Sequence, residues 1–262
     1  MAAPVGELLR GWRTRRRLSQ LDLAVGAGVS TRHLSYVETG RSRPSPELVL
    51  SLADHLDVPL RERNALLLAA GYAPRYRESG LDDATMAPVR DSIQRMLDAH
   101  HPYPALVVDR RWNLVMANEA AFGLVALLPP ELVADPLNVY RITLHPDGLA
   151  RHSPNPDDWV VSWLDTLRRQ ALLTGDAEVQ ALYDEVSTYP AAISALDASG
   201  LPSDDPPVVI PVTLDTPAGR ASLFTTLTTF GTALDITLDE LVVVLFWPAD
   251  ADSGEVLRRL AT

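Results

Sequence analysis

The 262-residue sequence predicts two domains, an all-α N-terminal domain of five helices and an α+β C-terminal domain with a five-stranded antiparallel sheet. Apolar residues recur at helical spacing through about the first 70 residues. Beyond residue 104, short runs of strand composition flank a largely helical stretch. Charge also changes sign along the chain. Residues 1–77 hold 12 arginines against 7 acidic residues, whereas residues 78–262 hold 11 against 27.

Five short helices are expected in the first domain, and three of them, the first, fourth and fifth, are described here. The first is expected from apolar residues at i, i+3, i+4 and i+7, namely Val5, Leu8, Leu9 and Trp12. Pro46 opens the fourth helix, which carries Leu48, Leu52 and Leu56. The fifth runs from about Pro59 to Gly71.

Two short helices between them are separated by Gly28, where the chain needs a left-handed backbone. Ser19 and Asp22 form a capping-box pattern at the start of the first short helix. Ser30 caps the second, which Gly40 closes. The sequence therefore predicts a compact pair of helices joined by a tight turn.

The rest of the chain begins with a linker and a connecting helix over 78–100, so the domains span 1–77 and 101–262. Strands are expected at 105–109 and 112–118, and Asn118 caps the helix that follows. The remaining elements are a helical stretch over 157–197, a hairpin of 208–214 and 221–229, and a last strand over 240–247. This order suits a five-stranded antiparallel sheet with helices on one side, as in PAS-like sensor domains.

The paired short helices fit a helix-turn-helix. Ala24 is small where the helices cross, and Gly28 stands at the turn. Apolar residues that set the angle between the helices stand at Leu23, Val29, Leu34 and Val37. A structural helical bundle is the alternative, but the locally basic segment favours DNA binding.

These residues resemble the Cro/C1-type, or XRE, helix-turn-helix family through "LSQLDLA", "GVSTRHLSYVETGRSRPS" and "LADHLDVP". Further on, "RERNALLLAAGYAP" and "HPYPALVVDRRWNLVMAN" look like the MmyB-like regulators, which join such a domain to a PAS-like ligand-binding domain. The resemblance covers nearly the whole chain and weakens beyond residue 150. It implies a transcription regulator that binds double-stranded operator DNA as a homodimer and is controlled by a small apolar, fatty-acid-like ligand.

In this docking geometry the second helix of the pair enters the major groove. Thr31, Arg32 and Tyr36 are the expected base-reading residues, because they stand on its exposed N-terminal face. A solvated helix surface is the alternative for each of them.

Phosphate contacts are expected from three further residues, Gln20, Arg41 and Arg43, which flank the recognition helix or begin the helix before it. Arg15 to Arg17 fit either a phosphate-binding run or a solvated charge run. The resemblance also implies a structural ion pair between Arg13 and Glu38.

A ligand pocket in the second domain is expected from aromatic residues, although core packing is the alternative for each: Phe122, Tyr140, Trp159, Trp163, Phe224 and Phe230. Arg141 or Arg168 is the candidate partner for a carboxylate head group.

Cysteine is absent, which excludes disulfides and thiolate metal sites. We expect no cofactor and no metal. Haem or metal ligation by His100 and His101 is the alternative to linker or surface histidines. No signal-peptide pattern and no apolar run of membrane-spanning length occurs, so a cytoplasmic protein without a membrane partner is expected. Two rival functions remain, a C-terminal domain that binds a protein partner and, without a supporting motif, an enzyme.

Overall fold

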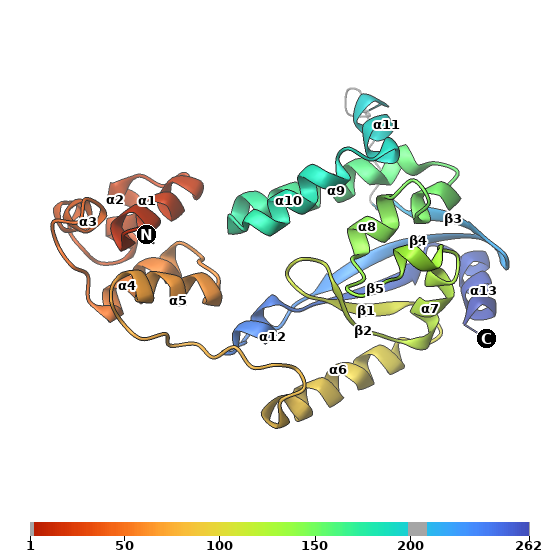
Figure 1. Ribbon diagram of the computed structural model, residues 1–262, viewed down its shortest axis with the longest axis horizontal. Coiled ribbons are helices and arrows are strands. Elements are labelled where there is room, and N and C mark those ends of the chain that lie inside the picture. Colours follow the sequence, from red (N-terminus) through yellow and green to blue (C-terminus); the bar gives the residue numbers. More distant parts are fainter. Residues whose placement is uncertain (1–2, 199–208, 262) are drawn as a thin grey trace. The chain divides into compact units, whose positions relative to one another are not determined.

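The computed structural model describes residues 3–198 and 209–261 (Figure 1). The chain forms two compact units. The first comprises Met1–Ser79 with Leu172–Thr174 and Gly231–Asp239, and the second comprises the remaining stretches. The predicted fold classes are confirmed, since the first 70 residues are helical and the later region contains a five-stranded antiparallel sheet.

The first unit contains the five expected helices: α1 (Val5–Arg15), α2 (Gln20–Gly26), α3 (Thr31–Glu38), α4 (Pro46–His55) and α5 (Leu60–Ala69). Ser19 and Asp22 complete a capping box at α2. The Ser30 side chain accepts a hydrogen bond from the backbone of His33 and so begins α3. Gly28 has φ +67°, which lets the chain turn sharply between the two helices.

The core of the first unit is made of apolar side chains from all five helices, including Leu9, Trp12, Leu23, Leu34, Val49, Leu52, Leu66 and Leu67. Helix α1 approaches α3 closely at Gly6. A Cβ atom placed there would lie 2.4 Å from the carbonyl oxygen of Val37, so only glycine fits. This approach fixes the C-terminal end of α3 against α1.

The second unit is built on a sheet of order β2-β1-β5-β4-β3, with antiparallel neighbours throughout. Its strands are β1 (Ala105–Val108), β2 (Leu114–Ala117), β3 (Val212–Thr216), β4 (Gly219–Thr228) and β5 (Val242–Pro248). Strand β5 lies at the centre and pairs Phe246 with Thr225 and Val244 with Leu106. Side chains of these four residues share one face of the sheet because strand side chains alternate.

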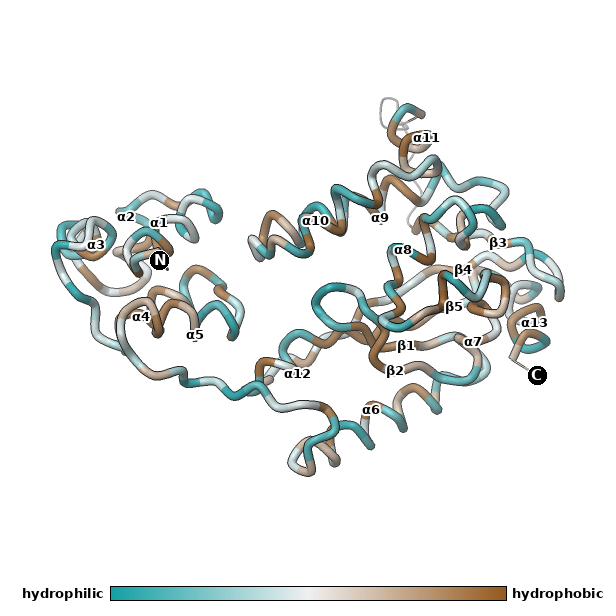
Figure 2. Tube along the Cα trace, in the orientation of Figure 1, coloured by the Kyte–Doolittle hydropathy of each residue, from teal (hydrophilic) through white to brown (hydrophobic). Residues whose placement is uncertain are grey.

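The second unit also contains the helices α6 (Ala87–Ala99), α7 (Glu119–Val125), α8 (Val139–Leu144), α9 (Pro156–Thr174), α10 (Ala177–Val186), α11 (Pro190–Ala198) and α13 (Ala251–Leu260), although the last three residues of α9 group with the first unit. Helix α12 (Ile236–Glu240) lies almost wholly in the stretch Gly231–Asp239, which belongs to the first unit. Short 3-10 turns cover Ala84–Met86, Pro130–Leu132 and Leu149–His152. In Figure 2, hydrophobic residues recur along α6 between hydrophilic ones, and its residues Ile93 and Leu97 are buried.

The expectation of helices on one side of the sheet is wrong. Figure 1 shows α6 along one side and α8 and α9 along the other. His100, at the end of α6, packs edge-to-face on Trp247, whereas Trp159 of α9 shares a pocket with the adjacent strand residue Phe246. Neighbouring residues of one strand point to opposite faces, so β5 needs cover on both.

Several element boundaries also differ from expectation. Strand β3 begins at Val212 rather than 208, and Val208 lies outside the described residues. Helices α8, α12 and α13 were not predicted. Helix α13 packs through buried Val256 and Leu257, while its first four residues, Ala-Asp-Ser-Gly, are small or polar and resemble a loop in sequence.

Candidate nucleic-acid interface and apolar pockets

Four candidate DNA-binding residues lie on the exposed side of α3 or just beyond its end. Arg32 donates a hydrogen bond from Nε to the hydroxyl of Tyr36 at 3.0 Å, one helical turn later. The guanidinium carbon of Arg32 lies 5.4 Å from the ring centre of Tyr36, and that of Arg41 lies 6.0 Å from it. Thr31 is exposed at the first position of the same helix. The ring of Tyr36 therefore holds two cationic groups beside the start and the end of α3.

Glu38, at the last position of α3, lies in a buried polar cluster. Arg13 donates from Nε to Oε1 at 2.6 Å and from a terminal nitrogen to Oε2 at 3.0 Å. The Gln20 amide donates to Oε2 at 2.8 Å. Burial alone would raise the pKa of Glu38, but these hydrogen bonds outweigh it and lower the pKa. Glu38 therefore stays ionised and ties α1, α2 and α3 together.

The structure thus brings Arg13 and Glu38 together and directs the side chain of Gln20 toward them. Gln20 is half-buried, and its amide nitrogen is engaged by the carboxylate. The backbone at the start of α2 is capped by Ser19 and Asp22. A phosphate contact by Gln20 stays a prediction, with the second N–H of the amide nitrogen as the remaining donor.

Arg43 lies apart from the α3 group. It donates to the carbonyl of Ala70 at 3.0 Å and to that of Gly71 at 3.2 Å, and it stacks 4.8 Å from the Tyr72 ring centre. Its side chain therefore satisfies carbonyls at the end of α5. Phosphate binding by Arg43 stays a prediction. It would use the guanidinium N–H groups that do not donate to Ala70 and Gly71.

The three arginines of the basic run, Arg15 to Arg17, also differ in whether their side chains are engaged within the protein. Arg16 donates to the carbonyls of Leu56 and Asp57, both at 2.8 Å, and so satisfies the end of α4. Arg15 is exposed and lies 4.5 Å from the Trp12 ring centre, while Arg17 is exposed with φ 56°. Sequence reasoning missed the capping by Arg16 and Arg43, because these contacts join residues 27 to 41 positions apart.

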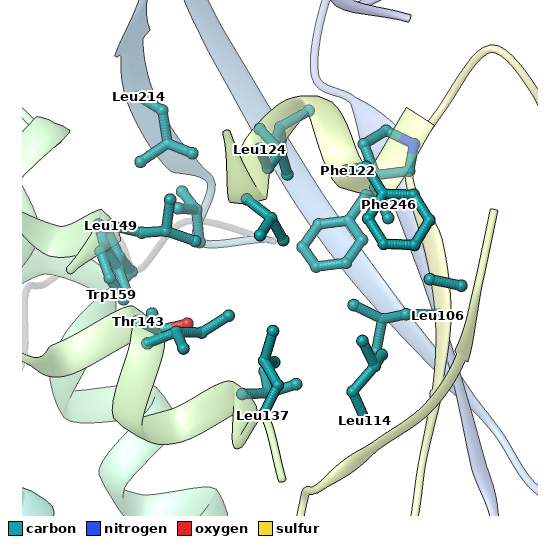
Figure 3. A pocket seen from close by; sticks show the side chains of 18 residues that line it. Leu106, Leu114, Phe122, Leu124, Leu137, Thr143, Leu149, Trp159, Leu214 and Phe246 are labelled. Atoms are coloured by element: carbon teal, nitrogen blue, oxygen red, sulfur yellow. The ribbon is translucent and has the colours of Figure 1, made fainter. Parts of the chain in front are cut away.

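The second unit contains a narrow pocket of about 50 Å³ over the α7–α8 side of the sheet. Side chains converge on it from β1, β2, β3, β5, α7, α8 and α9, as Figure 3 shows for Leu106, Leu114, Phe122, Leu124, Thr143, Trp159, Leu214 and Phe246. Thr143 and Trp159 are the only two of its described lining residues with a polar side-chain atom. The lining of this narrow pocket is therefore almost wholly apolar.

A wide pocket of about 370 Å³ lies beside it, with Trp159 lining both. Four rings line the wide pocket, those of Trp112, Tyr140, Trp159 and Trp163, together with the hydroxyl-bearing residues Ser162, Thr166 and Thr225. The rings form a chain of edge-to-face contacts with centre distances of 4.9 to 5.6 Å. Its volume lies in the range of ordinary small-molecule sites.

Of the six aromatic residues predicted to line a ligand pocket, four line one or both of these pockets and two line neither. Phe122 lines the narrow pocket, Trp159 both, and Tyr140 and Trp163 the wide pocket. Phe224 and Phe230 line neither of the two. Phe224 stands between Leu223 and Thr225 on β4, so strand alternation turns it to the opposite face. Sequence reasoning also missed the aliphatic lining from α7 and α8, which reads as ordinary core.

Arg141 and Arg168 line neither pocket. Arg141 makes two hydrogen bonds to Glu185, at 2.8 and 2.7 Å, and Tyr189 donates to the same carboxylate. The hydrogen bond from Arg141 is the main cause that lowers the pKa of Glu185. Arg168 pairs with Asp165 at 3.0 Å on the exposed side of α9.

His100 is buried, and its Nε2 lies 2.8 Å from the carbonyl oxygen of Phe246. Its ring is used in packing against Trp247 and Tyr103. Within residues 3–198 and 209–261, no group of three or more histidine, aspartate or glutamate side chains is arranged to hold a metal ion. Over the same ranges, no helix has both the length and the apolar character to cross a bilayer.

Comparison with known proteins agrees with this architecture. Residues 4–66 match a helix-turn-helix domain family, and residues 89–260 match the family described as MmyB-like transcription regulator ligand binding domain. The HTH-type transcriptional regulator RghRB of Bacillus subtilis is 36% identical over 77 residues, which are 29% of this chain and 53% of that relative. The chain thus spans about half the length of the curated relative it matches. With most of its length matched in this way, the chain belongs to the family of MmyB-like transcription regulators.

Proposed function

We propose that this protein is a cytoplasmic transcription regulator that binds double-stranded operator DNA through α3. The observation that carries the proposal is the exposed side of α3, where Arg32, Tyr36 and Arg41 lie together on the second helix of a helix-turn-helix and just beyond it. In this motif the second helix enters the major groove. No catalytic step is part of the proposal.

In this proposal Thr31, Arg32 and Tyr36 contact the bases. Arg32 can present two N–H groups to the O6 and N7 atoms of a guanine, and Thr31 can contact a thymine methyl group or a base edge. The bond from Arg32 to the Tyr36 hydroxyl limits the rotamers of a long side chain, so less conformational entropy is lost on binding.

Gln20, Arg41 and Arg43 contact the phosphates in this proposal. Arg41 is the strongest of these because it is exposed beside the end of α3, next to the base-reading group. Such contacts position the domain on the duplex and carry no sequence information.

The protein acts as a homodimer in this proposal. A palindromic operator presents half-sites about 34–36 Å apart, and one small helical domain reads one half-site. The N-terminal domain carries net charge +5 and the acidic remainder −16, so DNA attracts the first and repels the second. Dimer contacts are therefore expected mainly outside residues 1–70.

A small, elongated and mostly apolar molecule binds in the second unit and modulates DNA binding. Support comes from the narrow pocket, which is lined almost wholly by hydrocarbon, and from the wide pocket beside it. Burial of apolar ligand surface there supplies about 25 cal/mol per Å².

The test begins with selection of preferred duplexes from a random library by the full-length protein. Fluorescence anisotropy then compares a selected duplex with a scrambled one for the wild type and for Arg32→Ala. We expect clear discrimination in the wild type and less in the variant. Equal affinity of the wild type for both duplexes would overturn sequence-specific binding.

Mass spectrometry of gently denatured protein tests the ligand separately. Release of a lipid-like molecule supports ligand control. An empty domain, combined with a protein partner that co-purifies in stoichiometric amount, would favour the alternative in which the second unit binds a protein.

A further inference from the structure

We propose that the segment connecting β4 to β5, residues 231–239, is the element through which the second unit controls DNA binding, with Asp235 and Asp239 as its positioning residues. This connection segment belongs to the first unit, although the two strands that it joins belong to the second. The inference rests on the proposed binding of DNA through α3 and its control by the second unit, and it names the residues that transmit this control.

The first turn of α5 receives its cap from the connection segment. Pro59 stands at the N-cap position of this helix and supplies no side-chain acceptor. Oδ2 of Asp239 accepts a hydrogen bond from the backbone N–H of Leu60, the first residue of α5, at 3.3 Å. The N–H groups of a first helical turn have no partner within the helix, and a negative charge near them is favourable. Asp239 therefore stabilises the start of α5 although it lies 179 positions away in the sequence.

Asp235 and its neighbour Ile236 hold the linker that follows α5. The carboxylate of Asp235 accepts from the backbone N–H of Ser79, which lies 3.1 Å from Oδ2 and 3.3 Å from Oδ1. The N–H of Ile236 donates to the carbonyl of Arg77 at 2.8 Å, and the Ile236 side chain is buried. Oδ1 of Asp235 also accepts from the N–H of Thr237 at 3.0 Å. One carboxylate therefore begins α12 and fixes the linker.

The linker is in turn fastened to α5. Oδ1 of Asn64 accepts from the N–H groups of Arg75 and Tyr76, at 2.9 and 3.0 Å, and its Nδ2 donates to the carbonyl of Tyr76 at 2.8 Å. Arg61 pairs with Glu78 at a nitrogen–oxygen distance of 2.9 Å. Helix α5, the linker and the connection segment therefore form one hydrogen-bonded cluster within the first unit.

This cluster reaches α3 through the core of the first unit. Leu66 and Leu67 of α5 pack in the same core as Leu34 and Val37 of α3. A close-packed interior transmits strain because it contains few voids. A shift at the start of α5 therefore changes the support of the helix that is proposed to read DNA.

The connection segment is equally tied to the second unit, because it continues two strands of the sheet. Leu227 of β4 and Val244 of β5 are paired in register, and both line the wide pocket. Leu227 precedes the segment by four residues, and Val244 follows it by five. The main chain therefore links this part of the sheet directly to Asp235 and Asp239. The hydrogen bonds of these two carboxylates, made or broken, are the two states that both units bias.

The experiment uses reciprocity, since a route from the second unit to DNA also carries the effect of DNA back. Hydrogen exchange of the full-length protein is followed by mass spectrometry, with and without a duplex that the wild type selects from a random library. We expect the duplex to slow exchange by about fivefold or more in the connection segment. The adjoining strand ends, residues 226–230 and 240–244, should also be slowed, whereas α13 should not.

Two outcomes separate the inference from the function on which it rests. Protection confined to residues 1–79 would overturn the inference and leave DNA binding intact. If the wild type selects no duplex, the DNA-binding function fails and the inference fails with it.

Paired variants then test the two carboxylates at saturating duplex. Asp235→Ala combined with Asp239→Ala should abolish the slowing in the connection segment and the strand ends, while α3 stays protected by DNA. Asp235→Asn combined with Asp239→Asn keeps oxygens that accept the hydrogen bonds and should restore most of the slowing. Asp91→Ala combined with Asp98→Ala is the matched control, because both carboxylates are exposed on α6 and the change in charge is the same.

Slowing that persists in the alanine pair, with that pair folded by circular dichroism, would contradict transmission through Asp235 and Asp239. Loss of the slowing in the asparagine pair as well would assign the effect to charge and overturn their role as hydrogen-bonding positioning residues.

Discussion

Arg13 of α1 and Glu38 of α3 are joined by two hydrogen bonds, from Nε to Oε1 at 2.6 Å and from a terminal nitrogen to Oε2 at 3.0 Å. Glu38 has a side-chain exposure of 1% and Arg13 of 13%, so water screens this pair little. The recognition helix is thus anchored at its last residue by a contact that faces away from its exposed side.

Glu38→Ala should destabilise the helical domain by about 3–5 kcal/mol, because it leaves the buried Arg13 guanidinium without its partner. Denaturant unfolding of the full chain, with hydrogen exchange to localise the loss to α1–α3, measures the effect. Glu255→Ala is the control, since its partner Arg258 and Glu255 itself are both exposed. A similar small effect in both variants would mean that the buried pair contributes little.

The pair also predicts a pH dependence. The pKa of Glu38 is lower in the folded than in the unfolded chain, because hydrogen bonds from Arg13 and Gln20 outweigh the effect of burial. Its contribution to stability is therefore present above the unfolded pKa, about 4.3, and is lost as pH falls through the lower folded value. Glu38→Gln should flatten this acid limb of the stability curve, and an unchanged limb would contradict the assignment.

Arg32→Ala should reduce the difference in binding free energy between operator and random duplex by about 1–3 kcal/mol. Tyr36→Phe keeps the ring but removes the hydroxyl that holds Arg32, so its effect should be in the same direction and smaller. Anisotropy titrations on both duplexes measure it. Equal weakening on operator and random DNA by Arg32→Ala would show that α3 does not read bases through this residue.

Arg41→Ala and Arg43→Ala should distinguish phosphate binding from the capping of helix α5. Both should weaken operator and random DNA alike and make the salt dependence shallower by about one phosphate contact. Arg43→Ala should in addition lower the melting temperature, because it exposes the carbonyls of Ala70 and Gly71. An unchanged salt slope in Arg43→Ala, with reduced stability, would limit this residue to helix capping.

Gly6→Ala should destabilise the domain by about 1–3 kcal/mol, since the new Cβ would lie 2.4 Å from the carbonyl oxygen of Val37 and force α1 from α3. Gly11→Ala in the same helix is the matched control. No atom lies within 4 Å of its Cβ position, so this change should stabilise by about 0.5–1 kcal/mol. Thermal unfolding of both variants gives the comparison, and equal shifts would contradict the close approach.

The full-length protein should be a dimer at micromolar concentration, and it should bind selected palindromic DNA as one dimer per duplex. Light scattering coupled to size-exclusion chromatography measures the mass with and without DNA. A duplex with a single half-site is the control and should bind far more weakly. Tight binding of a monomer to that half-site would contradict the proposal.

Local sequence signals determined the helical domain and the five strands of the second unit in their chain order. Ser19, Ser30 and Gly28 act through neighbours a few positions away, so their caps and turn could be read directly. The exposed positions of α3 follow from helical periodicity once Leu34 and Val37 are known to be buried. The family resemblance added the partners of the ion pair, which local spacing alone does not provide.

Only the tertiary structure decided which polar side chains are engaged and which apolar ones surround a pocket. Arg43 reaches the end of α5, and Gln20 turns to Glu38, across distances that no local pattern encodes. Phe224 and Thr225 are neighbours in sequence, yet strand alternation turns only Thr225 toward the wide pocket. Burial patterns in a sequence show which residues avoid water, but a cavity exists only where several elements meet and fail to fill the space between them.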